Sequence, residues 1–191
     1  MPLIVGIDEA GRGPWAGPVV AAGVMLDHEF AIVGLNDSKK LSAKAREGLY
    51  DQIFDRALFV SVAVVGPAEI DQINILRATL KAMGQVLAEI SSRSPIDWAL
   101  VDGQHIIPNT TIKQRAVVKG DSLEPSIMAA SIVAKVHRDR LMIAYDAEYP
   151  GYGFAGHKGY GTKAHMVAID QLGPCAIHRM SFAPLKSPSL L

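Results

Sequence analysis

Strand-like and helix-like segments alternate along this chain, and that alternation constrains the fold more than any other feature of the sequence. Short apolar runs predict strands, at residues 3–8, 19–26, 57–65, 97–101 and 114–118. Apolar residues spaced three and four positions apart predict helices, at 42–56, from 67 through 75–90, at 125–147 and at 162–172. Strands that alternate with helices form a sheet with helices on both faces, so we expect an α/β domain.

Composition narrows the classes of function. The chain has 191 residues, 49% of them hydrophobic, which is enough for one domain with a sizeable core. Its 19 basic and 19 acidic residues exclude binding to nucleic acid through bulk positive charge, but not through a local basic groove. The single cysteine, Cys175, excludes an internal disulfide and a cysteine-based zinc site. Asp8 and Glu9 end the apolar N-terminal run too early for a membrane helix, so we expect a soluble, cytoplasmic protein.

Acidic residues stand at or near the ends of three predicted strands. They are Asp8 with Glu9, Asp102 and Asp121. In open α/β sheets, functional sites lie at the ends of the strands. Neighbouring carboxylates repel each other unless they are protonated, paired with cations or bound to metal. Carboxylate oxygens suit hard cations such as Mg²⁺ or Mn²⁺, and two such ions can promote phosphodiester hydrolysis.

A structural interpretation of the same acids stays open, because aspartate beside glycine is also a common turn signal. Adjacent residues on a regular strand point to opposite faces of the sheet. Asp8 and Glu9 can therefore share a site only if the strand breaks there, which the nearby Gly11 and Gly13 would allow.

Two segments carry a local excess of positive charge. Residues 38–46 hold four basic residues and no acid, and residues 113–140 hold six basic residues against three acidic ones. Either segment can be a solvated helix face, but an excess of this kind also fits a groove for a phosphate backbone. The second segment includes Asp139, a reserve metal ligand whose more ordinary role would be a surface ion pair.

Two glycine-rich segments could approach a ligand closely. The glycines on either side of Arg12 let the backbone approach a ligand, although a tight surface turn would show the same pattern. The glycines on either side of Tyr160 leave its ring room to stack on a base or sugar. His157 and His165 lie in the same segment, but no third ligand at zinc spacing accompanies them.

Several motifs, in order along the chain, resemble those of bacterial type 2 ribonuclease H (ribonuclease HII), from about Ile4 to Lys186. They are GIDEAGRGPWAGPVV, GLNDSKKLS, VDGQ, VVKGDSLEPSIMAASIVAKVHRD, YGFAGHKGYGT and HRMSF. The resemblance implies a single ribonuclease H-like domain over residues 1–191, with a mixed sheet flanked by helices. Residues 150–191 are expected to form a small C-terminal helical segment.

The resemblance also implies an endonuclease that uses two Mn²⁺ or Mg²⁺ ions. Such an enzyme cuts on the 5′ side of ribonucleotides in RNA–DNA hybrids and at single ribonucleotides in duplex DNA, leaving 3′-hydroxyl and 5′-phosphate ends. It serves primer removal and ribonucleotide excision repair. We expect it to bind nucleic acid and no membrane, and to be a monomer.

The resemblance assigns roles to individual positions. The catalytic metal ligands map onto Asp8, Glu9, Asp102 and Asp121. The ribose-sensing loop maps onto Gly11, Arg12 and Gly13, and the junction-reading tyrosine onto Tyr160. We expect the phosphate backbone to meet Lys39, Lys40 and Lys119, and more weakly Ser131. Met180 occupies a position where another basic residue would be expected.

Two other functions remain open at this stage. A different two-metal nuclease of the same fold would cut all-DNA substrates, and the Gly-Arg-Gly loop would then have no purpose. A non-catalytic module that only binds hybrids would lack at least one of the four acids, yet all four are present.

Overall fold

The computed structural model describes residues 2–27, 32–36, 38–39 and 41–186. A mixed five-stranded sheet with the order β3-β2-β1-β4-β5 forms its centre. The central strand β1 pairs antiparallel with β2, which pairs antiparallel with β3, and β1 pairs parallel with β4, which pairs parallel with β5. The strands are β1 (Ile4–Ala10), β2 (Val19–Leu26), β3 (Ala57–Val65), β4 (Trp98–Asp102) and β5 (Gln114–Val117). The expected α/β class is therefore confirmed.

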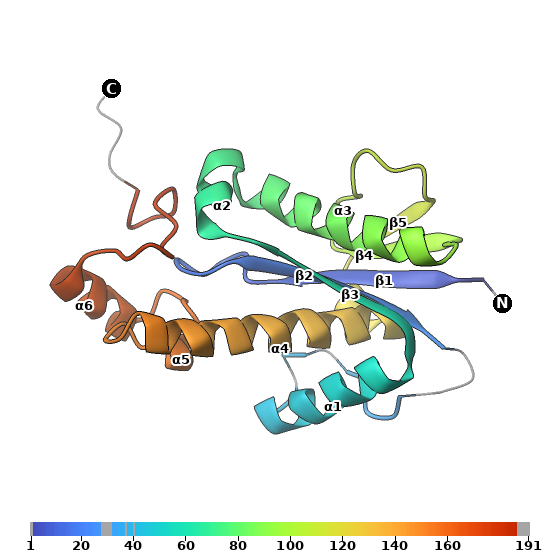
Figure 1. Cartoon of the computed structure of the whole chain (residues 1–191), viewed down its shortest axis with the longest axis horizontal. Coiled ribbons are helices and arrows are strands. Elements are labelled where there is room, and N and C mark those ends of the chain that lie inside the picture. The colour runs from blue at the N-terminus through green and yellow to red at the C-terminus, as the bar shows by residue number, and fades with distance from the viewer. Residues whose placement is uncertain (1, 28–31, 37, 40, 187–191) are drawn as a thin grey trace.

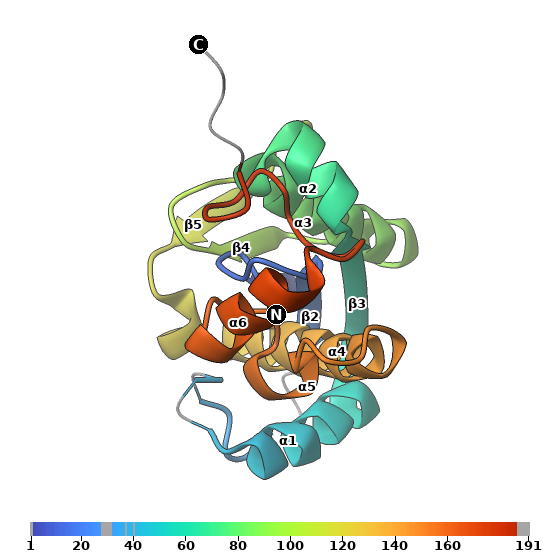
Figure 2. The same cartoon turned by 90° about the vertical axis from the view of Figure 1, so that its left-hand side faces the viewer.

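Helices cover both faces of this sheet. In Figure 1, α2 and α3 lie on one face, while α4 lies on the other face with α1 beyond it. Figure 2 shows α5 and α6 gathered at one end of the molecule. The helices are α1 (Ala43–Arg56), α2 (Pro67–Ile73), α3 (Ile75–Arg93), α4 (Pro125–Glu148), α5 (Phe154–His157) and α6 (Lys163–Leu172). No helix in the described ranges is long and apolar enough to cross a membrane.

Local sequence signals place most of these elements. Ser42 caps α1 by accepting a hydrogen bond of 3.2 Å from the Ala45 amide, as expected for a serine at this position. Thr162 caps α6 in the same way, and Pro67 occupies the first turn of α2, where its missing N–H group is harmless. The buried face of α3 packs on the sheet through residues such as Ala82 and Val86. Element boundaries accordingly lie within a few residues of the predicted ones.

Two features of the site region differ from the simplest interpretation of the sequence. The first strand does not break at Asp8 and Glu9, because Glu9 and Ala10 still pair with Ala21 and Val20 of β2. Asp121 does not follow a strand directly: β5 ends at Val117, Lys119 adopts a left-handed conformation, and Asp121 lies in the short 3₁₀ turn η1 (Gly120–Ser122). The glycine-rich stretch 150–161 also contains the short helix α5, which was not predicted.

A close backbone contact joins β1 to α4. A Cβ atom added to Gly6 would lie 2.2 Å from the carbonyl carbon of Ser126 in the first turn of α4. Only glycine permits this approach, which brings the middle of α4 up to the end of β1 that carries the acids.

We predict that Gly6→Ala lowers the free energy of unfolding by about 1–3 kcal/mol, since the added methyl group meets helix backbone that cannot move aside. Gly48→Ala is the matched control, because Gly48 is exposed in α1 with no atom within 4 Å of its added Cβ. The control should raise stability by up to about 1 kcal/mol through helix propensity. Urea denaturation of both variants measures the difference, and equal effects would contradict the assigned contact.

Candidate active site

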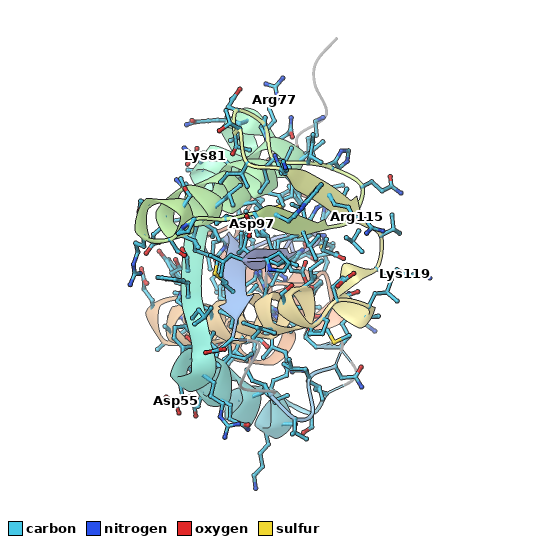
Figure 3. The ribbon with its side chains drawn as sticks, turned by 90° about the vertical axis from the view of Figure 1, so that its right-hand side faces the viewer. Asp55, Arg77, Lys81, Asp97, Arg115 and Lys119 are labelled. Atoms are coloured by element: carbon cyan, nitrogen blue, oxygen red, sulfur yellow. The ribbon has the colours of Figure 1, made fainter. Side chains whose placement is uncertain are left out.

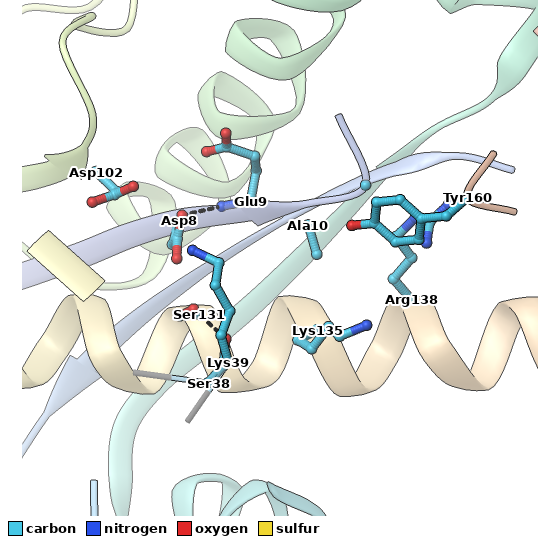
Figure 4. Close-up of a pocket in the computed structure, with 11 residues that line it drawn as sticks. Asp8, Glu9, Ala10, Ser38, Lys39, Asp102, Ser131, Lys135, Arg138 and Tyr160 are labelled. Atoms are coloured by element: carbon cyan, nitrogen blue, oxygen red, sulfur yellow. Dashed lines mark hydrogen bonds between the residues drawn. The ribbon is translucent and has the colours of Figure 1, made fainter. Parts of the chain in front are cut away.

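Asp8 and Glu9 project from opposite faces of β1 (Figure 4). The Asp8 side chain points toward α4 and is 5% exposed, whereas Glu9 points to the other side. The Asp8 Oδ1 atom accepts a 2.7 Å hydrogen bond from the Glu9 amide. Both side chains nevertheless line one pocket of about 170 Å³ together with Asp102. The two carboxylates therefore reach a common site around the end of a continuous strand.

The parallel pairing of β1 with β4 brings Asp102 to the same edge of the sheet. Asp102 is the last residue of β4, and its Oδ1 atom accepts a 3.3 Å hydrogen bond from the Asp121 amide. The Asp121 carboxylate lies outside the pocket lining and pairs with the Lys39 ammonium at 3.0 Å. Backbone hydrogen bonds thus link the four predicted acids in two pairs, Asp8 with Glu9 and Asp102 with Asp121. Within the described ranges, no three His, Cys, Asp or Glu side chains are already grouped closely enough to hold a metal ion.

Burial and mutual repulsion act on these carboxylates. Burial, followed by the charges of Glu9 and Asp102, raises the pKa of Asp8 well above its usual value. Burial also raises the pKa of Glu9, against the opposing effect of Arg12, whose guanidinium lies 3.3 Å from the Glu9 carboxylate. The pKa of Asp102 is raised by burial and by the charge of Asp121. A bound cation would relieve this repulsion, so these oxygen donors fit Mg²⁺ or Mn²⁺.

Only some of the residues predicted to contact phosphate line this pocket. The Lys39 side chain is 79% exposed and lines the pocket, while Lys119 is exposed on the loop after β5 (Figure 3) and does not line it. Ser131 lines the pocket from α4, and its hydroxyl is 2.9 Å from the Ser38 hydroxyl. Lys40 lies outside the described residues.

The basic residues of segment 113–140 do not all face one groove. Arg138 is only 1% exposed, and its guanidinium donates to the carbonyl oxygens of Ala16, Pro18 and Lys158. Arg140 pairs with Glu47 of α1. The reason is the packing of α4, one side of which is buried against loops and α1. On the same helix Asp139 pairs with Lys135 at 2.7 Å, the ordinary role considered for it.

A buried arginine that charge patterning could not reveal holds the Gly-Arg-Gly turn. Arg179 is 0% exposed and donates to the carbonyl oxygens of Gly11 at 2.6 Å, Arg12 at 3.0 Å and Gly17 at 2.9 Å. The HRMSF motif contains Arg179, but charge alone does not distinguish a buried arginine from a surface one. These bonds turn the carbonyl groups of the loop into the protein.

The two glycines of the turn serve different purposes. Gly11 has φ of +95°, and an added Cβ would lie 2.0 Å from Arg138 Nε, so the fold itself requires glycine there. An added Cβ at Gly13 would meet only the Tyr160 ring, at 3.8 Å. Gly13 thus leaves open space beside the pocket. Tyr160 is 46% exposed and lines that pocket with Gly11 and the acids, so the structure brings these predicted elements together.

Known proteins resemble this chain in both sequence and fold. A family model described as Ribonuclease HII matches residues 5–185. The chain is 54% identical to Ribonuclease HII of Syntrophotalea carbinolica over 179 residues, covering 94% of this chain and 84% of the relative. Its fold matches the ribonuclease in the PCNA:RNase HII complex from Archaeoglobus fulgidus, with a TM-score of 0.81, 26% identity and 98% coverage of both chains. The structure of Bst-RNase HIII in complex with Mn²⁺ shares the fold, with a TM-score of 0.77, 18% identity and coverage of 97% of this chain and 68% of the other.

We predict that Asp8→Asn stabilises the metal-free protein at neutral pH. The pKa of Asp8 is higher in the folded than in the unfolded state, so its ionised form destabilises the fold above the folded pKa. This cost shrinks as pH falls below the folded pKa and vanishes near the lower pKa of the unfolded chain. In EDTA at pH 8 the variant should therefore unfold with a free energy higher by roughly 1–3 kcal/mol, and the difference should shrink toward pH 4.

Urea denaturation across this pH range measures the effect, and Asp55→Asn on the exposed face of α1 is the control. A constant difference between Asp8→Asn and the parent at all pH values would show that packing, not charge, is responsible.

Proposed function

The chain belongs to the ribonuclease HII family and is therefore a ribonuclease H, a phosphodiester hydrolase, and from this premise we propose a specific substrate. The enzyme cuts on the 5′ side of ribonucleotides in RNA–DNA hybrids and at single ribonucleotides in duplex DNA, leaving 3′-hydroxyl and 5′-phosphate ends. It serves primer removal and ribonucleotide excision repair. The observation that carries the proposal is one pocket lined by Asp8, Glu9 and Asp102, by Gly11 and by the Tyr160 ring.

The carboxylates supply the metal site of this proposal. Asp8, Glu9, Asp102 and Asp121 hold two divalent ions, Mn²⁺ or Mg²⁺, and the raised pKa values of the first three support cation binding there. Divalent ions bound at such a site activate a water and stabilise the leaving oxygen. The chain's own contribution is to orient the ligands: the Glu9 amide holds Asp8, and the Asp121 amide holds Asp102.

The turn at Gly11–Gly13 recognises the ribose. A 2′-hydroxyl both donates and accepts hydrogen bonds, and it distinguishes RNA from DNA at a given position. Arg179 occupies the carbonyl groups of Gly11 and Arg12. The amide groups of Arg12 and Gly13 donate to no other described residue, which leaves them available to the sugar. Open space at Gly13 allows the sugar to approach the backbone.

Positively charged side chains position the duplex without reading its sequence. Lys39 and Lys119 are both exposed; Lys39 pairs with Asp121 at 3.0 Å, and Lys119 lies two residues before Asp121 in the chain. Lys40 and, more weakly, Ser131 complete the proposed set of phosphate contacts. Met180 is 47% exposed and uncharged, so we assign no phosphate contact there.

A cleavage assay tests the function directly. Duplex DNA with one embedded ribonucleotide should be cut on its 5′ side in Mn²⁺ or Mg²⁺, while the all-DNA duplex of the same sequence stays intact. Asp8→Asn and Asp102→Asn should each reduce kcat by about a hundredfold or more, because loss of one ligand misplaces the ions. Cleavage of the all-DNA duplex, or near-full activity of either variant at saturating metal, would sink the proposal.

Tyr160 should set the preference for a ribonucleotide followed by DNA. We predict that Tyr160→Ala lowers kcat/KM on a single embedded ribonucleotide about 5- to 150-fold, as expected from the loss of one stacking contact worth about 1–3 kcal/mol. Its effect on a long RNA–DNA hybrid should be smaller. Competition between the two labelled substrates in one reaction measures the ratio of their kcat/KM values.

Gly13→Val is the companion variant. Its side chain would fill the space where the sugar approaches, so kcat/KM should fall on both substrates. Equal losses on the two substrates for Tyr160→Ala would identify Tyr160 as a packing residue.

A further inference from the structure

Three histidines form a cluster beneath Tyr160 that the proposed chemistry does not use. His165 is 0% exposed and His178 is 3% exposed. The rings of His157 and His165 stack with centroids 4.4 Å apart and planes 16° apart. We call His157, His165 and His178 the histidine cluster.

The partners of each ring nitrogen determine the tautomers. His157 Nδ1 accepts from the Gly159 amide at 3.1 Å, so its Nε2 carries the proton and donates to the Tyr152 carbonyl at 2.8 Å. His178 Nδ1 accepts from the Cys175 amide at 2.9 Å and also lies 3.2 Å from the Cys175 thiol and 3.3 Å from its carbonyl. In the neutral arrangement His178 Nε2 carries the proton and donates to His165 Nε2 at 3.1 Å, because the Tyr160 carbonyl beside His165 Nδ1 can only accept. His165 must then carry its proton on Nδ1, which donates to the Tyr160 carbonyl at 3.0 Å.

All six ring nitrogens are satisfied by this one arrangement, in which every ring is neutral. Burial lowers the pKa of His165 to about 4, which keeps that ring neutral at physiological pH. No ring nitrogen remains for a zinc ion. The cluster therefore acts through hydrogen bonds to the backbone.

Those hydrogen bonds converge on the peptide groups around Tyr160. His157 holds the Gly159 amide, and His165 holds the Tyr160 carbonyl. The flanking glycines are packed tightly as well: an added Cβ would lie 2.4 Å from the Ala16 oxygen at Gly159 and 2.2 Å from the Trp15 ring at Gly161. The Tyr160 ring is about half exposed. Its position is consequently set by the backbone beneath it more than by packing of the ring.

We propose that His157 and His165 are positioning residues for Tyr160, and that His178 holds His165 in the tautomer this requires. The inference rests on the proposed role of Tyr160 in junction recognition. The histidine cluster then determines how strongly the enzyme prefers a single embedded ribonucleotide over a long hybrid.

Two substitutions of His165 distinguish the effect of its hydrogen bond to Tyr160 from the effect of filling space. In His165→Asn the side-chain amide can occupy the place of Nδ1 and still donate to the Tyr160 carbonyl, whereas His165→Leu cannot. The preference, measured as the ratio of kcat/KM on the two substrates, should fall about three- to tenfold in His165→Leu, the worth of one hydrogen bond. It should fall less in His165→Asn.

A double-variant cycle with Tyr160→Ala supplies the decisive readout. A positioning residue acts only through its target, so adding His165→Leu to Tyr160→Ala should leave the ratio unchanged. Ile169→Ala is the matched control, because Ile169 is buried on the same helix as His165, in an apolar cluster that includes Phe154, and its side chain makes no hydrogen bond to the histidines. It should lower the melting temperature and leave the ratio within twofold of the parent.

Each outcome is decisive at a temperature where all variants are folded. If Tyr160→Ala changes the ratio and His165→Leu does not, the positioning role is wrong while the proposed function stands. If Tyr160→Ala leaves the ratio unchanged, the junction role of Tyr160 is wrong, and the positioning role that rests on it is wrong as well. If His165→Leu does not fold, His178→Phe replaces it, since losing the donor to His165 Nε2 should lower the ratio too; an unchanged ratio would overturn the inference.

Discussion

Two buried guanidinium groups hold the loop on which the site depends. Arg138 and Arg179 together donate to six backbone carbonyl groups, five of them between Gly11 and Pro18. Neither forms an ion pair with a described residue. Burial lowers the pKa of Arg138 to about 10 and that of Arg179 to about 9, so both remain charged at neutral pH. Because a buried charge without these carbonyls would be costly, the loop cannot leave the arginines without destabilising the fold.

The carboxylate cluster, unlike the two arginines, destabilises the fold when it is ionised. Its members are held close by secondary structure, and their raised pKa values show that the ionised cluster opposes folding. The close packing of α4 on β1 at Gly6 and the parallel pairing of β1 with β4 keep these charges together. Such a cluster is poised to bind a cation, since the repulsion already built into the fold is released when a counter-ion arrives. Stability and the proposed metal affinity are thus linked at the same three side chains.

Recognition is divided between an exposed surface and a buried support. The Tyr160 ring lines the pocket and borders the open space at Gly13, while Arg179 and the histidine cluster hydrogen-bond to the backbone of the same two loops. Residues 178 and 179 are adjacent in the sequence but support different loops. His178 donates to His165, which holds the Tyr160 carbonyl, whereas Arg179 donates to carbonyl groups of the Gly11 turn. The C-terminal segment therefore supports both elements that we propose to contact the sugar, and this explains why HRMSF can matter without touching substrate.

The sequence by itself determined the elements, since caps such as Ser42, apolar periodicity and glycine-rich turns act over a few residues. Its motifs also indicated the family and the acids, three of which, Asp8, Glu9 and Asp102, line one pocket in the structure. Strand order, the antiparallel pairing of β1 with β2, and the burial of Arg138 and Arg179 were decided only by the tertiary structure. Asp8 and Glu9 illustrate the difference. Local alternation correctly put them on opposite faces of a strand, but whether both reach one pocket depends on where β1 ends relative to β4 and α4, and those contacts join residues about a hundred positions apart.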